Sequence, residues 1–151
     1  MKLFFKIVLI GFVVVLVSGC SAKGPQFKGF VQPVAGQSNV YIYRKSYMGA
    51  AVTPDIHQVN LSTKEEKNLG GLKPNGYILT TVEPGTYKFW ARTEAKNEVT
   101  LKANPGTNYC IEHYISMGFL VGHPQFRIVD MQQCKQDIKK ARLITNNKNI
   151  K

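Results

Sequence analysis

The chain contains the three side-chain types of a nucleophilic catalyst close together in sequence, in Ser116, His113 and Asp130. A serine nucleophile needs a base within hydrogen-bond reach, and a third group must orient that base. Residues 108–116 (NYCIEHYIS) alternate in the manner of a strand, which places His113 and Ser116 on opposite faces. The chain also lacks a GxSxG elbow, a paired acidic motif, a glycine-rich phosphate loop and an HExxH helix. We therefore predict no catalytic residues and no enzymatic activity.

The ligand types of a structural zinc site are also present, in Cys110, His113, His123 and Cys134. A step of three residues along a strand sends Cys110 and His113 to opposite faces, so the spacing does not suit a shared ion. We predict no metal site and no cofactor. His113 is interpreted as a hydrogen-bonded histidine of the core, and His57 and His123 as surface or turn residues.

The third cysteine, Cys20, follows a segment that is typical of exported proteins. Two lysines precede an apolar run at residues 7–17, whose length suits a secretory signal and is short for a membrane span. Residues 17–20 (VSGC) resemble a bacterial lipobox, in which a peptidase cuts before the cysteine and that cysteine is then acylated. We predict a lipoprotein signal peptide at residues 1–19 and lipidation of Cys20. The alternatives are an uncleaved anchor helix and an ordinary signal peptide.

Acylation of Cys20 would attach the mature chain to a membrane of the bacterial envelope. Ser21 and Ala22 stand where lipoproteins kept at the inner membrane often have aspartate, so the lipobox resemblance implies the periplasmic face of the outer membrane. Cys110 and Cys134 would then be the remaining thiols, and cysteines of exported proteins tend to pair. We predict a disulfide between them.

Residues 20–38 contain three glycines and two prolines with little periodicity, which is typical of a flexible tether. Phe27, Phe30 and Val31 are the residues of this tether that could dock onto the edge of a domain. The domain itself is expected at residues 39–144.

Most of that domain has the residue pattern of β-structure. Residues 39–45 (NVYIYRK) predict the first strand and residues 56–61 a weaker one, followed by a polar turn at residues 62–71 (STKEEKNLGG). Pro-Gly-Thr occurs at residues 84–86 and 105–107, between runs of β-forming residues. Proline followed by glycine is typical of a type II turn, and we expect each turn to close an antiparallel hairpin.

The spacing of the apolar residues changes near the carboxyl end of the chain. Residues 126–130 (FRIVD) are the last expected strand, and residues 131–142 follow with apolar positions at helical spacing. These positions are Met131, Cys134, Ile138 and Ala141. We predict a short helix packed on the sheet and a polar tail at residues 145–151, with a final strand at residues 142–145 as the alternative. The whole predicts a mainly β, antiparallel sandwich with a short C-terminal helix.

The formal net charge of +11 favours anionic partners, but export and the lack of any RNP, zinc-finger or helix-turn-helix pattern argue against nucleic acid. On residues 87–92 (YKFWAR), alternation places Lys88, Trp90 and Arg92 on the outer face. A ring between two cations suits a sugar or an anionic headgroup. The alternative is that another strand or the closing helix covers Trp90.

A second cationic group lies at the carboxyl end. On the expected helix, Lys135, Lys139 and Arg142 form an outward stripe, and Lys140 adds a further cation. Lys148 and Lys151 extend the charge into the tail. The simple interpretation is solubility and favourable charge at a helix end. The functional interpretation is that this stripe holds the domain against an anionic envelope surface.

The order of these segments resembles the DUF2846 family of bacterial lipoproteins. The resemblance covers residues 27–144 and is carried by the lipobox, the proline-bearing tether, VYIYR, GGLKPNGYILTTVEPGTYKFWA, NPGTNYCIEHYI and the closing lysine-rich stretch. The chain departs from the family pattern at HQVNLSTKEEKNLGG, where a short Asp-Gly hairpin is expected. The resemblance implies a transthyretin-like or immunoglobulin-like sandwich in the envelope, and no settled activity. We expect a lipid-anchored, non-enzymatic adaptor or accessory lipoprotein. The alternative is a module that binds peptidoglycan or another anionic glycan.

Overall fold

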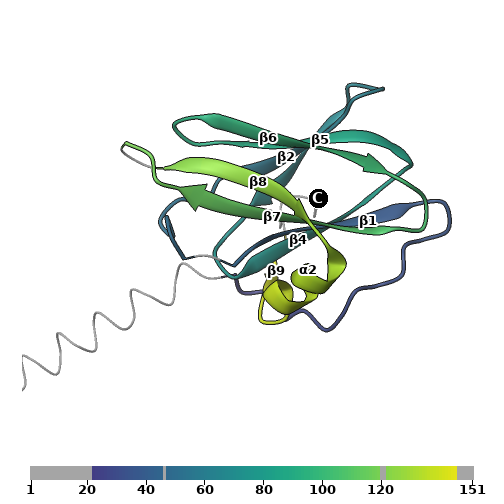
Figure 1. Cartoon of the computed structure of the whole chain (residues 1–151), viewed down its shortest axis with the longest axis horizontal. Coiled ribbons are helices and arrows are strands. Elements are labelled where there is room, and N and C mark those ends of the chain that lie inside the picture. The colour runs from purple at the N-terminus through teal and green to yellow at the C-terminus, as the bar shows by residue number, and fades with distance from the viewer. Residues whose placement is uncertain (1–21, 46, 120–121, 146–151) are drawn as a thin grey trace, which may run out of the picture.

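Two β-sheets lie face to face, and one helix packs outside the larger sheet (Figure 1). The architecture is that of a computed structural model, which describes residues 22–45, 47–119 and 122–145. The larger sheet contains β1 (Ser38–Arg44), β4 (Gly76–Val82), β7 (Asn108–Ser116), β8 (His123–Val129) and β9 (Arg142–Leu143), in the order β8-β7-β1-β4-β9. The smaller sheet contains β2 (Asp55–Asn60), β3 (Glu66–Gly71), β5 (Gly85–Arg92) and β6 (Lys96–Ala103), in the order β3-β2-β5-β6. The predicted mainly β sandwich is confirmed.

The central strand β1 is buried along its whole length, because both faces of the larger sheet are covered. Its β-forming residues alternate as expected, so Val40 and Ile42 point into the core between the sheets. Tyr41 and Tyr43 point to the opposite side, where they form a second cluster with the helix. The same strand therefore helps to build two apolar layers.

The two Pro-Gly-Thr turns do not close hairpins, and that prediction is wrong. Each turn carries the chain across the sandwich, the first from β4 to β5 and the second from β6 to β7. Gly106 has the positive φ, 71°, that a type II turn requires. Gly85 instead begins β5, where it pairs with Ala103. Turn residues favour a reversal of the chain, but they do not determine which sheet the next strand joins.

The pairing of the strands differs from a simple antiparallel meander in two further ways. β1 and β7 run parallel, as do β4 and β9, so the larger sheet is mixed. The second half of the predicted polar turn is a strand, β3, which pairs with β2 at the edge of the smaller sheet. Edge strands need few apolar side chains, and β3 buries only Leu69, which explains why its polar sequence indicated a turn.

The closing helix α2 (Met131–Ile138) confirms the predicted change of period. Asp130 caps its N-terminus, with the side chain accepting a 2.8 Å hydrogen bond from the backbone N–H of Gln133. Cys134 on the inner face of the helix is joined by a disulfide to Cys110 of β7. A turn at Lys139 and Lys140 follows α2 directly, and the chain then enters β9. Lys139, Lys140 and Arg142 therefore lie beyond the helix on which they were expected.

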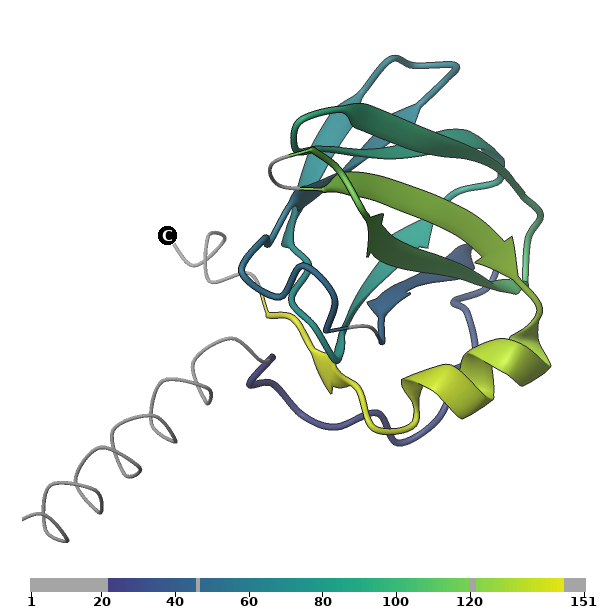
Figure 2. The same cartoon turned by 60° about the vertical axis from the view of Figure 1, so that its left-hand side comes forward.

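Residues 22–37, expected within the flexible tether, lie against the outside of the larger sheet beside α2 (Figure 2). The backbone N–H of Phe27 donates to the carbonyl of Ala141 at 2.9 Å, and that of Leu143 donates to Pro25 at 2.8 Å. The ring of Phe27 packs edge-on against Tyr77 at 5.7 Å between centroids. Its aromatic residues therefore make this segment part of the domain.

Several predictions fall on residues outside the described ranges. These are the signal peptide at residues 1–19, the lipidation of Cys20, and the tail positions Lys148 and Lys151. Within residues 22–45, 47–119 and 122–145, no helix combines the length and the apolar character that a membrane crossing needs.

Candidate functional site

Trp90 lies on the outer face of the smaller sheet, as the alternation predicted. Its neighbours along β5, Phe89 and Ala91, are fully buried in the core between the sheets. No strand or helix covers Trp90 within the described chain. The ring is half-buried by side chains of the two adjacent strands instead.

Those side chains occupy both sides of the indole. His57 of β2 stacks on it, with 3.9 Å between ring centroids and an angle of 11° between the planes. The Lys96 ammonium of β6 lies 4.3 Å from the ring centroid. β2 and β6 flank β5 on opposite sides, so the two partners cover opposite faces of the ring. A sugar could stack on Trp90 only if one of them moved away.

The lysines of this face are also paired. Lys88 lies 2.8 Å from a carboxylate oxygen of Glu98, and Lys96 lies 3.8 Å from the other oxygen. The hydrogen bond from Lys88, with further help from the charges of both lysines, lowers the pKa of Glu98. His57 is likewise 2.9 Å from Glu66. The predicted cationic face is thus a set of mutual ion pairs, with Arg92 exposed at its margin.

The C-terminal cations are more open. Lys135, Lys139 and Lys140 are exposed, and none of them has an ion-pair partner among the described residues. The Arg142 side chain donates to the carbonyl of Gly24 at 3.2 Å, which ties it to the N-terminal segment. The three lysines are therefore open to an anionic surface, whereas the Arg142 side chain is partly held by its hydrogen bond to Gly24.

A polar network beside α2 was not predicted. Asp137 accepts hydrogen bonds from the hydroxyl of Tyr43 at 2.8 Å, from Lys45 at 3.1 Å and from Gln133 at 3.0 Å. Burial alone would raise the pKa of Asp137, but these three bonds and the charge of Lys45 outweigh it and lower the pKa. Burial and the bond to Asp137 raise the pKa of Tyr43.

The network continues onto β7 and β8. Glu112 is buried and pairs with Arg127, whose Nε lies 2.6 Å from the carboxylate, and Lys45 lies 3.7 Å away. Every group in this network has a partner, and the network ties α2 and β8 to β1. We interpret it as structural. Each acidic residue of this network faces a cation on another element. Such pairs cannot be recognised in the sequence without the strand register.

The three residues considered for catalysis have separate roles. Asp130 caps α2, and the hydroxyl of Ser116 donates to the carbonyl of His123 at 3.3 Å. His113 is fully buried beside Phe126, with 5.0 Å between ring centroids. The described residues contain no group of three or more His, Cys, Asp or Glu side chains that could hold a metal ion.

His113 differs from its prediction in one respect. Neither ring nitrogen has a hydrogen-bond partner among the described residues, so this histidine is a core residue but not a hydrogen-bonded one. Burial, with a smaller contribution from the charge of Arg44, lowers the pKa of His113 to about 3. The imidazole is therefore neutral at physiological pH, which is how an unpaired ring can remain in the core.

Arg44, at the end of β1, was not singled out by the sequence. Its side chain is fully buried and donates to four backbone carbonyls, those of Met48, Gly49, Val52 and Leu72. These bonds hold the loop of residues 47–54 against the end of the sandwich. A charged residue at the end of an apolar strand gave no sequence signal that distinguished it from an exposed one.

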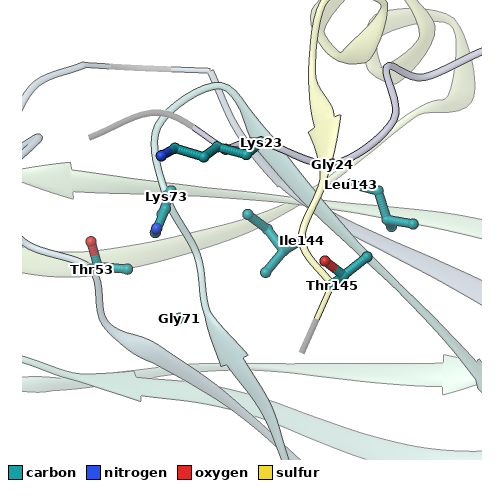
Figure 3. A pocket seen from close by; sticks show the side chains of 9 residues that line it. Lys23, Gly24, Thr53, Gly71, Lys73, Leu143, Ile144 and Thr145 are labelled. Atoms are coloured by element: carbon teal, nitrogen blue, oxygen red, sulfur yellow. The ribbon is translucent and has the colours of Figure 1, made fainter. Parts of the chain in front are cut away.

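A hollow of about 380 Å³ opens at this same end of the sandwich (Figure 3). Its lining includes the side chains of Lys23, Lys73, Thr53 and Ile144, together with the backbone around Gly24 and Gly71. In Figure 3 the amines of both lysines lie on the side of the hollow where Thr53 stands. This hollow brings together the N-terminal segment, the loop of residues 47–54 and the C-terminal strand. The sequence gave no sign that these segments meet.

Comparison with known proteins identifies the family. The model of "Protein of unknown function (DUF2846)" matches residues 34–124. The chain belongs to the DUF2846 family. An uncharacterized protein of Haemophilus influenzae (strain ATCC 51907 / DSM 11121 / KW20 / Rd) is 27% identical over 154 residues, which cover 97% of this chain and 88% of that protein. No solved structure matches the chain.

The DUF2846 match extends from the segment before β1 to the start of β8. It includes Cys110 and the Trp90 face. It does not include α2, Cys134 or the C-terminal cations.

Proposed function

We propose that this DUF2846 protein is a lipid-anchored, non-enzymatic accessory protein of the bacterial envelope, acting as an adaptor at the periplasmic face of the outer membrane. The observation that carries the proposal is the docking of the N-terminal segment. Ala22 is buried against the start of β4, where an added Cβ on Gly76 would lie 3.0 Å from the Ala22 side chain. Two extended residues span about 7 Å, so acyl chains on Cys20 would hold the sandwich directly at the membrane surface.

An adaptor also needs a surface that remains open when the protein is anchored. The outer face of the smaller sheet has no helix or N-terminal segment over it within the described residues. Along β6, the edge strand of this sheet, exposed residues alternate with half-buried or buried ones, and Thr100 is exposed at the middle of the strand. This face is the natural position for a protein partner, since the opposite face is already occupied by α2.

The anchor is tested by Cys20→Ala, with labelling of cells by a fatty-acid probe. The variant should lose both acyl labelling and cleavage after Gly19, because the acceptor sulfur is missing. The adaptor role is tested by placing a photo-crosslinking residue at Thr100 on the open face, with Gln132 on the exposed side of α2 as the matched control. Thr100 should yield one crosslinked envelope protein that Gln132 does not. Persistent labelling of Cys20→Ala would refute the anchor, and identical crosslinks at both positions would refute the adaptor face.

A second candidate function is binding of peptidoglycan or another anionic glycan. The observation that favours it is the set of exposed lysines on and after α2 that have no carboxylate partner among the described residues. The mutual ion pairs around Trp90 make the open face a weaker candidate for this role. Sedimentation of the protein with purified sacculi distinguishes this function from the adaptor role.

A further inference from the structure

One end of the sandwich gathers large apolar side chains that face solvent. We name it the anchor end, and it comprises residues 47–54 of one loop and residues 117–119 and 122 of another, together with Ala22, Lys23 and Lys73. The exposed side chains on the two loops are Tyr47, Met48, Met117 and Phe119. Phe119 is 95% exposed and Met117 is 87% exposed. Soluble domains seldom present such residues together unless they contact another apolar phase.

The two loops are neighbours, and the fold fixes their positions. An added Cβ on Gly49 of the first loop or on Gly122 of the second would lie within 3 Å of the same side chain, Ile115. The first loop is also held from inside by the hydrogen bonds from Arg44 to three of its carbonyls. Both loops thus project from a rigid base.

The N-terminal segment reaches the anchor end as well. Both views of the fold place the start of the described chain beside the loop of residues 47–54, at the end of the sandwich where β7 finishes and β8 begins (Figures 1 and 2). The described chain therefore starts at this end. The beginning of β1 and the turn at Gly106 lie at the opposite end.

Lysines accompany the apolar residues. Lys23 and Lys73 line the hollow beside Thr53, and neither has an ion-pair partner among the described residues (Figure 3). The acidic side chains nearest this end already interact with neighbours. His123 lies 3.4 Å from Glu94, and the side chain of Asn68 donates to Asp55 at 3.1 Å. Two cations beside a hydroxyl can receive a phosphate oxygen.

We propose that the anchor end is a bilayer-contact face. Met117 and Phe119 enter the interfacial region of the membrane, and Lys23 and Lys73 bind the phosphate groups of anionic phospholipids. Apolar side chains next to lysines are typical of proteins that lie on membranes. The inference deepens the proposed function and rests on it for the orientation of the domain, because acyl chains on Cys20 would bring this end to the lipid.

The test uses the full chain purified from membranes and placed in nanodiscs whose lipids carry bromine on their acyl chains, a quencher of tryptophan fluorescence. Phe119→Trp introduces a probe at the anchor end, and Val34→Trp introduces a matched probe at the opposite end, where Val34 is 66% exposed. Both positions are exposed, so neither change should disturb the fold. After subtraction of the signal of Trp90 in the parent, Phe119→Trp should be quenched several-fold more strongly than Val34→Trp.

The lysines are tested in the same assay. Lys23→Gln combined with Lys73→Gln should reduce quenching of Phe119→Trp in phosphatidylglycerol discs to the level measured in phosphatidylcholine discs. Lys102→Gln, an exposed lysine of β6, is the control and should change nothing. Equal quenching of the two tryptophan probes overturns the contact face, and an unchanged signal in the double variant overturns the phosphate contacts.

The mass of each sample shows whether Cys20 is acylated, which separates this inference from the proposed function. An acylated chain whose Phe119→Trp probe is not quenched overturns the contact face alone. A chain without acyl groups whose probe is quenched overturns the proposed anchor and leaves the contact face standing.

Discussion

The outer faces of the two sheets have opposite characters. The larger sheet is covered by α2, by the N-terminal segment and by the disulfide between Cys110 and Cys134. The smaller sheet faces solvent with ion pairs around Trp90. Both sheets are built from strands rich in β-forming residues. What separates them is the path of the chain ends, since both return to the larger sheet.

The difference extends to the buried polar groups. Every buried polar or charged residue of the described chain belongs to a strand of the larger sheet, and the set is Ser38, Asn39, Arg44, Thr80, Glu112 and His113. A buried polar group contributes stability only while its partners or its neutral form are preserved. The larger sheet should therefore be the part of the molecule that responds to pH, reduction and substitution, and the smaller sheet should tolerate change.

Low pH should have the largest effect, through His113. The unfolded chain binds a proton on this residue below its ordinary pKa of 6.5, whereas in the folded protein the pKa is lowered to about 3. The unfolded state therefore holds more protons between these values, and the free energy of unfolding falls as pH decreases, by about 1.4 kcal/mol per pH unit. Over the whole window of about 3.5 pH units the loss is about 5 kcal/mol.

Urea unfolding of the full chain in detergent, measured between pH 6 and pH 5, isolates histidines because carboxyl groups titrate near pH 4. His113→Leu should remove most of this slope, since leucine cannot bind a proton and suits the apolar site beside Phe126. His123→Gln, at the surface, should retain it. If His113→Leu and the parent show the same slope, the neutral buried histidine is not the source of acid sensitivity.

Loss of the disulfide should be the next largest effect. The bond closes a loop between residues 24 positions apart, which contributes about 3 kcal/mol in the chain-entropy model. Cys110→Ala combined with Cys134→Ala should lower the free energy of unfolding by that amount, and a reductant should lower the stability of the parent equally while leaving the variant unchanged. Alkylation of protein taken directly from cells gives an independent check. Free thiols at both positions would contradict the pairing in the envelope.

The sequence predicted the features that depend on local periodicity. The spacing of Met131, Cys134 and Ile138 indicated α2, because one apolar stripe at helical spacing has few other interpretations. Alternation in β5 placed Phe89 and Trp90 on their observed faces. These patterns were sufficient because each element buries at least one face against a large neighbour.

Features that depend on distant pairing could not be predicted. The sequence PGT at residues 84–86 and 105–107 predicted hairpins, and both turns cross between the sheets. The stack of His57 on Trp90 requires the register that places them opposite each other on β2 and β5. The hollow beside Lys23 and Lys73 likewise exists only because the N-terminal segment returns to β9. Local sequence patterns do not predict such contacts between distant segments.

The smallest effect on stability, and the sharpest contrast between the two sides, should come from removing surface charge. One variant changes Lys135, Lys139, Lys140 and Arg142 to glutamine. A matched variant changes Lys88, Arg92, Lys96 and Lys102 on the open face, with the same loss of charge. Exposed ion pairs contribute about 0–1 kcal/mol each, so the open-face variant should lose little stability through the pairs with Glu98. The α2 variant should lose less, since its lysines have no carboxylate partners in the described chain.

If the second candidate function holds, binding to sacculi should show the opposite order, with a larger loss in the α2 variant than in the open-face variant. The full-length protein in detergent is sedimented with purified sacculi across a series of salt concentrations. Each cation near an anionic surface contributes on the order of 1 kcal/mol at low salt, so the α2 variant should lose most of its binding, and the parent should lose it as salt rises. The open-face variant should still bind, because two of its four cations, Lys88 and Lys96, already pair with Glu98. Equal sedimentation of all three proteins at low salt would leave the C-terminal lysines with a role in solubility and helix-end electrostatics alone.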